Sequence, residues 1–411
     1  MNVTRRAMLR QAMTGAAGAG LGAGVARVAE GGVPAGRIWA GTDPRVRRFN
    51  TLGRTGMVVS DVSLGGGGLK NPDSVRHALD HGINLIDLAP DYGKAEETVG
   101  AVMAEPSRRA ATFLTSSLCR PGGYPGHVGA GRPRAELVAL VEGSLKRLAT
   151  DHLDILFVHA VGERGGAADV KRVDDPELFG AFEVLKRDGK IRFAGASSHG
   201  GGLEHNIGWV IDSGRFDVVQ ISFNYLSGKS LKALVLRARA AGLGVITMKA
   251  HRAIDEDRAR EVLGASGDEL RLAAIRWAWA NGADTVLPTM PEPARQLEYL
   301  RASGTTMSSL DEETLDRYAS AVSSSTCRLS CGELCGGACP FGVSIADALR
   351  YDMYYTEHRQ QRRAMEAYAR LGEGRAGACA TCTAAPCVRA CPYELPLRSL
   401  LQDADSRLRW A

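Results

Sequence analysis

An alternation of short apolar runs with amphipathic stretches constrains the fold of this 411-residue chain more than any other feature. Between about residues 59 and 304, apolar runs of strand length are separated by stretches in which apolar residues recur every three or four positions. Eight such runs occur: VSDVSLG, NLIDLAP, TFLTSSL, LDILFVHAV, IRFAGASSH, DVVQISFN, GVITMKA and DTVLPTM. Eight strand–helix units in about 250 residues are typical of a (β/α)8 TIM barrel, so we predict an α/β fold of that type.

A doubly wound open sheet is the alternative, but it usually has fewer strands and a glycine-rich phosphate turn. The segment LGGGGL at 64–69 lacks the G-x-G-x-x-G order, so we interpret it as a closely packed loop. In a barrel, the residues at the carboxyl ends of the strands line the active site. This rule selects Asp87, Ser117, His159, Ser197, Gln220, Lys249 and Thr289 with their neighbours.

The N-terminus carries paired arginines, Arg5 and Arg6, followed by a weakly hydrophobic Gly/Ala stretch. This pattern resembles a twin-arginine export signal, which implies transport of the folded protein to the periplasm. We therefore expect a signal and linker at 1–40, a barrel at 41–305 and a separate C-terminal domain at 306–411. No small-residue cleavage site closes the apolar stretch, so a cleaved leader and an N-terminal membrane tether both stay open. The formal net charge of +5 is mild and does not predict a nucleic-acid partner.

Eight of the nine cysteines lie in two bursts near the C-terminus. The first burst reads C-x3-C-x3-C-x3-C-P and the second reads C-x2-C-x4-C-x3-C-P. Their cysteines are Cys327, Cys331, Cys335 and Cys339, and then Cys379, Cys382, Cys387 and Cys391. Export favours disulfides, but a chain with its own large core does not need them. Zinc sites usually separate two cysteine pairs by a longer gap. The C-x3-C-P ending is typical of bacterial ferredoxins.

The sequence after each Cys–Pro is similar, PFGVSIADALR and PYELPLRSLLQ. This internal repeat predicts an α-helical, ferredoxin-like domain with two [4Fe–4S] clusters, with zinc and disulfides kept as alternatives. In two-cluster ferredoxins the fourth cysteine of each run binds the other cluster. Cys339 would then join the second burst and Cys391 the first, although the unequal spacing leaves this pairing open. The glycines in the first burst argue against a helix that aligns its cysteines. The segment after it, 343–372, predicts one or two amphipathic helices that pack onto the barrel.

Two segments, FNTLGRTGMVVSDVSLG and GINLIDLAPDYGKAEETVG, resemble the opening and the second strand of the aldo-keto reductases. The likeness covers residues 48 to about 304. In that family a tyrosine donates a proton while NADPH delivers hydride to a carbonyl, an aspartate and a lysine tune the tyrosine, and a histidine orients the substrate. The resemblance implies that Asp87, Tyr92 and His159 take the roles of aspartate, tyrosine and histidine.

The family's lysine has no counterpart, because the matching position is Ser117. A phenol near pKa 10 is a poor acid at neutral pH unless a cation lowers its pKa. Two hypotheses follow. Either Lys249 or Lys94 supplies the charge, or the standard hydride reaction is weak or absent, and we favour the second.

The resemblance also implies positions for NADP(H). Ser197 and Ser198 match the stretch that holds the nicotinamide carboxamide, and Gln220 matches the family's glutamine. Lys249 ends the seventh strand, and Arg295 falls in the region that binds the adenosine end. A guanidinium there suits a 2′-phosphate. NADP(H) therefore stays open as a cofactor.

Together these features resemble an exported branch of the family with a C-terminal ferredoxin-type segment. We predict an iron–sulfur oxidoreductase that acts on a small carbonyl or alcohol substrate. Electrons would pass through its clusters to or from a redox partner protein or a quinone-linked donor. Two alternatives remain, an NADPH-dependent reductase with structural clusters and a non-enzymatic electron carrier or binding protein with a degenerate barrel site. The ninth cysteine, Cys119, is interpreted as an incidental thiol.

Overall fold

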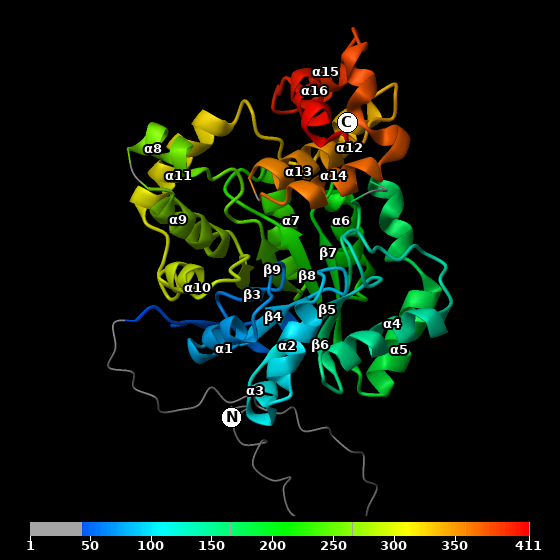
Figure 1. Cartoon of the computed structure of the whole chain (residues 1–411), viewed down its shortest axis with the longest axis vertical. Helices are drawn as coiled ribbons and strands as arrows, with labels where there is room; N and C mark the ends of the chain where they lie inside the picture. The colour runs from blue at the N-terminus through cyan, green and yellow to red at the C-terminus, as the bar shows by residue number, and fades with distance from the viewer. Residues whose placement is uncertain (1–42, 164–165, 265, 358, 411) are drawn as a thin grey trace, which may run out of the picture. The chain divides into compact units, whose positions relative to one another are not determined.

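The computed structural model describes residues 43–163, 166–264, 266–357 and 359–410 (Figure 1). The expected export signal at 1–40 lies outside these residues. Eight parallel strands of the described chain form one sheet, in the order in which they occur in the sequence. They are β3 (Leu64–Gly65), β4 (Leu85–Asp87), β5 (Phe113–Leu118), β6 (Leu153–Val158), β7 (Ile191–Ser198), β8 (Val218–Ser222), β9 (Gly244–Met248) and β10 (Thr285–Leu287).

The sheet is nearly closed into a barrel. Isolated parallel bridges pair Val62 with Val286 and Gly65 with Thr289, next to the first and the last strand. Each of the eight apolar runs contains one of these strands, so the predicted (β/α)8 barrel is confirmed.

A β-hairpin precedes the barrel. Its strands are β1 (Phe49–Thr51) and β2 (Val58–Ser60), joined through the short turn η1 (Gly53–Thr55). Leu52, Met57 and Val59 of this hairpin segment are buried with the inward-facing residues of the barrel strands, among them Ile155 and Phe157. The first predicted run therefore spans two separate strands, β2 and β3.

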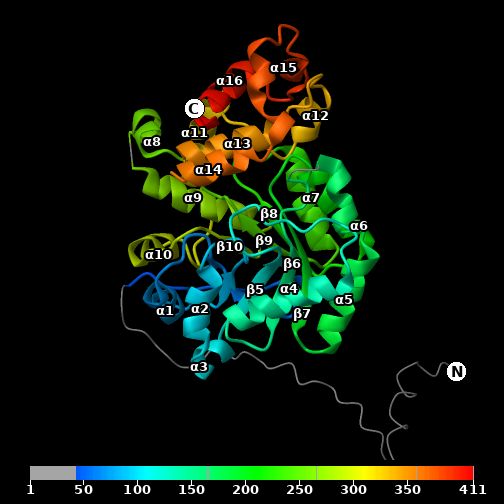
Figure 2. The ribbon, with the colours of Figure 1, turned by 45° about the vertical axis from the view of Figure 1, so that its right-hand side comes forward.

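The helices surround the sheet (Figure 2). They are α1 (Pro72–Asp80), α2 (Ala95–Met103), α3 (Pro106–Ala110), α4 (Arg134–Arg147), α5 (Pro176–Arg187), α6 (Leu203–Ser213), α7 (Lys229–Ala240), α8 (Glu256–Leu263), α9 (Gly267–Ala280) and α10 (Pro293–Leu300), with a 3-10 segment η2 (Gly166–Arg172) before α5. Local sequence sets their ends. At α1, the Asn71 side chain accepts a hydrogen bond from the Asp73 N–H and proline occupies the first helical position. Gly82, just past this helix, adopts the left-handed conformation, with φ of 93°.

Helix α11 (Ser309–Val322) begins at a capping box formed by Ser308 and Asp311. Its buried residues Leu315, Tyr318 and Val322 join the core between the barrel and its helices. The buried residues of a second core all come from the C-terminal segment apart from Tyr124, and Tyr92 packs against this core from the barrel. Its elements are α12 (Gly332–Gly337), α13 (Ile345–Thr356), α14 (Gln361–Ala369), η3 (Gly372–Gly374), η4 (Ala376–Ala380), α15 (Pro386–Ala390) and α16 (Leu397–Leu408).

The internal repeat seen in the sequence has a structural counterpart. A helix begins five residues after each Cys–Pro proline, α13 after Pro340 and α16 after Pro392. Arg407 of α16 forms an ion pair with Asp352 of α13 at 2.7 Å. Segment 343–372 contains two helices, α13 and α14, as predicted.

The expectation that glycines exclude helix from the first cysteine burst was wrong in part. Helix α12 includes Gly332, Gly336 and Gly337. It is only six residues long, so Cys335 is the one cysteine inside it and Cys331 occupies its N-cap. The helix is thus too short to align the four cysteines of the burst.

Figures 1 and 2 both draw α13 and α14 beyond the strands of the barrel, with α12, α15 and α16 farther out. Among the described residues, none of the helices is long and apolar enough to cross a membrane.

Candidate functional site

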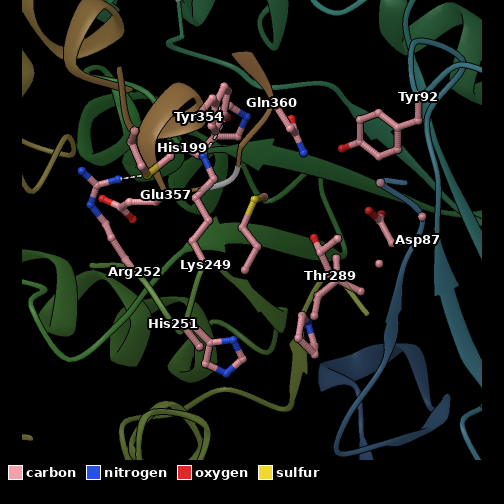
Figure 3. Close-up of a pocket in the computed structure, with 18 of the residues that line it drawn as sticks. Asp87, Tyr92, His199, Lys249, His251, Arg252, Thr289, Tyr354, Glu357 and Gln360 are labelled. Carbon is pink, nitrogen blue, oxygen red and sulfur yellow. Dashed lines mark hydrogen bonds between the residues drawn. The ribbon is translucent and has the colours of Figure 1, made fainter. Parts of the chain in front are cut away.

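A cavity of about 360 Å³ lies at the carboxyl ends of the barrel strands. Its volume falls in the range of small-molecule sites. The barrel contributes Asp87, Tyr92, Gln220, Lys249 and Arg295 to its wall, and the C-terminal segment contributes Met353, Tyr354, Glu357, Gln360 and Arg363. Figure 3 shows Asp87 and Tyr92 on one side of this cavity and Lys249, Tyr354 and Arg252 on the other. The C-terminal segment is therefore part of the site.

Asp87 is the last residue of β4, and its Oδ1 accepts a hydrogen bond from the Thr115 hydroxyl at 2.7 Å. Burial raises the pKa of Asp87 to about 6, while hydrogen bonds from Thr115 and Gln220 oppose the rise. Burial also raises the pKa of Tyr92 well above its usual value, and the charges of Asp87 and Asp91 add to the effect. Tyr92 is therefore a weaker acid than a free phenol.

Ser117, at the position of the family's lysine, is buried in β5. Lys249 donates a hydrogen bond to the Tyr354 hydroxyl at 3.0 Å. Burial and the nearby arginines hold the pKa of Lys249 well below its usual value. Lys94 is exposed ahead of α2. A cation that works to lower the pKa of Tyr92 is Arg363 of α14, which no motif in the sequence indicates.

Three predicted site residues lie outside the cavity wall. His159 is buried, and its ring packs edge-on against Tyr92 with centroids 5.9 Å apart. Ser197 Oγ accepts a hydrogen bond from the Ala160 N–H at 2.8 Å. Ser198 Oγ donates to the backbone carbonyl of Val161 at 2.6 Å. Both hydroxyls therefore hydrogen-bond the backbone that follows β6, and neither serine lines the cavity.

The proposed nucleotide residues fit a dinucleotide only in part. Gln220 and Arg295 line the cavity, but the two serines that would hold the carboxamide do not. The Arg295 guanidinium forms an ion pair with Glu298 and lies over the Tyr299 ring, 5.6 Å from its centroid. We therefore derive no step through NADP(H).

A buried polar network joins the barrel to the C-terminal segment. Glu163, after β6, accepts hydrogen bonds from Arg350, from Tyr124 and, at 3.2 Å, from Tyr351. The side chains of Glu163 and Arg350 are both fully buried. Burial works to raise the pKa of Glu163, but Arg350 and His127 outweigh it and hold that pKa well below its usual value. No motif in the sequence predicts this network.

The eight C-terminal cysteines form two groups. Burial raises the pKa of Cys335 to about 12, and the neighbouring thiols of Cys327, Cys331 and Cys391 add to the rise. Burial likewise raises the pKa of Cys379 to about 11, and its neighbours are Cys339, Cys382 and Cys387. We name these sets the first group (Cys327, Cys331, Cys335, Cys391) and the second group (Cys339, Cys379, Cys382, Cys387). Each group exchanges its fourth cysteine with the other burst, which is the arrangement expected for crossed ligation.

All nine cysteines are free thiols, so the described chain contains no disulfide. A tetrahedral zinc site with bonds of about 2.3 Å holds its sulfurs roughly 3.8 Å apart. Within the described residues, no three of the C-terminal cysteine sulfurs lie within 4.8 Å of one another.

The first group adjoins the cavity. Arg252 lines the cavity, and its Nη2 donates a hydrogen bond to the Cys327 carbonyl at 2.9 Å. The second group has a counterpart in Arg398, whose Nε donates to the Cys379 carbonyl at 3.2 Å. A small hollow lined by all four cysteines of the second group contains no barrel residue.

Comparison with known proteins identifies the barrel. A model of the aldo/keto reductase family matches residues 70–256. An oxidoreductase of Bacillus subtilis, YrpG, is 30% identical over 171 residues, which are 37% of this chain and 50% of that protein. The aldo-keto reductase YhdN of the same organism is 34% identical over 127 residues, 27% of this chain and 37% of that protein. This chain therefore spans half or less of the length of these relatives.

A solved structure supports the same fold. The holo form of an aldo-keto reductase from Bacillus halodurans is 20% identical and superimposes with a TM-score of 0.53, covering 66% of this chain and 96% of that one. Residues 70–256 thus match the aldo/keto reductase family, whose members among the relatives are oxidoreductases, and the described chain has a barrel of that fold.

Proposed function

We propose that this chain is an exported iron–sulfur oxidoreductase that acts on a small carbonyl or alcohol substrate in the barrel cavity. The observation that carries the proposal is the gathering of eight cysteines into two groups of four, one of which adjoins the cavity through Arg252. The aldo/keto reductase domain supports the substrate class.

The residues present suit two [4Fe–4S] clusters. Each group offers four thiols, the ligand set that such clusters take. When bound, the clusters would supply one-electron transfer. The first group would face the substrate and the second a redox partner protein or a quinone-linked donor.

The cavity residues would supply the protons. Reduction of a carbonyl to an alcohol consumes two electrons and two protons. Tyr92 and Tyr354 present hydroxyl groups from the barrel and from α13, and Lys249 hydrogen-bonds the second of them. Asp87, with a pKa raised to about 6, is a group that exchanges protons near neutral pH.

A turnover experiment tests the proposal. The protein is purified without oxygen, reduced with dithionite, freed of excess reductant and mixed with candidate carbonyl compounds. We expect the clusters to reoxidise while alcohol forms, with two electrons consumed per product. Reversible cluster reduction with no conversion of any candidate would instead favour an electron carrier with a degenerate barrel site.

Gln220 and Arg295 in the cavity wall favour a second candidate function, an NADPH-dependent reductase with structural clusters. Tight NADPH binding and turnover by the unmodified protein, with no change in cluster oxidation state, would support it over the first.

Export is part of the proposal and has its own test. A reporter fused behind residues 1–40 should reach the periplasm, and replacing Arg5 and Arg6 by lysines should retain it in the cytoplasm. Unimpeded export of the double-lysine fusion would argue against the twin-arginine route.

A further inference from the structure

The ninth cysteine lies apart from the other eight, in a buried cluster of possible metal ligands. Cys119 follows β5 and belongs to neither cysteine group. Its thiol lies beside Asp91, in the loop after β4, and His159, just after β6. Within the described residues, these form the one set of three His, Cys, Asp or Glu side chains whose donor atoms all lie within 4.8 Å of one another. All three residues are buried, with 0%, 3% and 3% of their surface exposed.

Two of the donors lack hydrogen-bond partners. Asp91 Oδ1 and His159 Nδ1 are buried and make no hydrogen bond within the described chain. A buried polar atom left in that condition costs about 1–3 kcal/mol and needs an explanation. His159 Nδ1 lies 3.6 Å from Asp91 Oδ2, which is too long for a good hydrogen bond. Nitrogen and oxygen ligands on one tetrahedral zinc ion stand roughly 3.3 Å apart, so the carboxylate lies near enough to the ring for one ion to reach both, with its Oδ1 still unpartnered.

We infer that Asp91, Cys119 and His159 form a mononuclear zinc site, separate from the cavity and from both cysteine groups. Thiolate, imidazole and carboxylate are the three side-chain ligands that zinc takes in proteins. None of the three residues lines the cavity, so the ion would be structural. It would tie together the loops that follow three consecutive strands of the barrel.

The surroundings support the ligand set. Asp91 Oδ2 accepts a hydrogen bond from the Gly126 N–H at 2.9 Å, which orients the carboxylate. His127 pairs with Cys119 in an antiparallel bridge, and its ring lies 5.5 Å from that of His159. Its Nε2 lies 3.1 Å from Glu163 Oε2, so this ring belongs to the Glu163 network and is not counted among the ligands.

The site has a consequence for the cavity. Asp91 precedes Tyr92 in the chain, and the Tyr92 ring packs on His159. A divalent cation held there would offset the charge of Asp91, which raises the pKa of Tyr92. The barrel would thus regain part of the positive charge that its missing lysine does not supply.

Metal analysis with zinc-edge X-ray absorption on the full-length, anaerobically purified protein tests the inference. The protein is first incubated with one equivalent of Zn²⁺ and desalted. We expect about one zinc per chain, bound by one sulfur at about 2.3 Å and otherwise by nitrogen and oxygen at about 2.0 Å. Zinc below one-tenth of an equivalent would overturn the inference. Zinc bound by four sulfurs would overturn it as well, and would point to the cysteine groups as the zinc sites.

Variants provide a second readout. Cys119→Ser and His159→Ala should each lower the retained zinc at least tenfold and leave the iron and sulfide content unchanged. Asp87→Asn, a buried carboxylate variant outside the proposed ligand set, is the matched control and should retain zinc. If a variant fails to fold, the absorption spectrum of the unmodified protein still decides the question. Iron content, measured in parallel, separates failure of this site from failure of the cluster proposal.

Discussion

At Tyr92, two carboxylates act on one phenol. Burial raises the pKa of Tyr92, and the charges of Asp87 and Asp91 raise it further. The position of the family's lysine holds Ser117, whose hydroxyl carries no charge to oppose them. For NADPH-dependent carbonyl reduction, the second candidate function, we expect Ser117→Lys to pair with Asp87, lower the pKa of Tyr92 and increase the rate by about 100-fold over the unmodified protein, at the low end of the range for general acid catalysis. Steady-state NADPH oxidation measures it. Ser117→Met is the uncharged control, and an equal gain with methionine would contradict the electrostatic explanation.

The carboxyl of Asp87 makes stability depend on pH. Its pKa rises from 3.8 to about 6 on folding, so between pH 4 and 6 the folded state holds more protons than the unfolded state. The stability that the protonated group contributes is therefore present below pH 4 and lost as the pH rises through 6, with a change of about 3 kcal/mol. Asp87→Asn cannot titrate. The melting temperature of this variant, relative to that of the unmodified protein, should rise between pH 4 and 6 and stay constant above pH 7. A difference that does not change with pH would exclude the raised pKa.

Helix α13 is held on the barrel by a buried ion pair. Arg350 and Glu163 are both inaccessible to solvent, so removing one partner leaves a buried charge without compensation. Arg350→Met should destabilise the docked C-terminal segment by about 3–5 kcal/mol. Tyr351→Phe removes one hydrogen bond to the same carboxylate and should cost about 1 kcal/mol. Hydrogen exchange of α13 amides reports both changes, and near-equal effects would show that the ion pair is not the main restraint.

Local patterns predicted the elements but not their long-range contacts. Each barrel strand lies within an apolar run because a strand that is buried on both faces needs apolar residues at consecutive positions. Asp87 and Tyr92 were found because strand ends line a barrel mouth, but His159, Ser197 and Ser198 lie behind the cavity wall. Tyr354 and Arg363 reach the cavity from helices far along the chain, and Arg350 meets Glu163 across 187 positions. Such contacts depend on how two segments dock, which periodicity does not encode.

Across the whole molecule, two arginines mark the two cysteine groups. Arg252 donates to the Cys327 carbonyl beside the cavity, and Arg398 donates to the Cys379 carbonyl in the second group. Positive charge near a cluster favours its reduced form. Arg252→Ala should lower the midpoint potential of one cluster by on the order of 50 mV, equivalent to about 1 kcal/mol for one electron. Arg398→Ala is the matched variant and should lower the potential of the other cluster only. Equal shifts of both clusters in either variant would contradict the assignment.

If each of the two cysteine groups holds an iron–sulfur cluster, electrons can pass between the barrel cavity and a redox partner. We expect anaerobically purified protein to contain about eight iron and eight acid-labile sulfide per chain, because two four-iron clusters fill the two groups. Iron and sulfide analysis with electron paramagnetic resonance of the dithionite-reduced protein is the most direct measurement. Two interacting reduced clusters are the predicted result. Cystines, or zinc bound by four sulfurs in place of iron, would contradict the account.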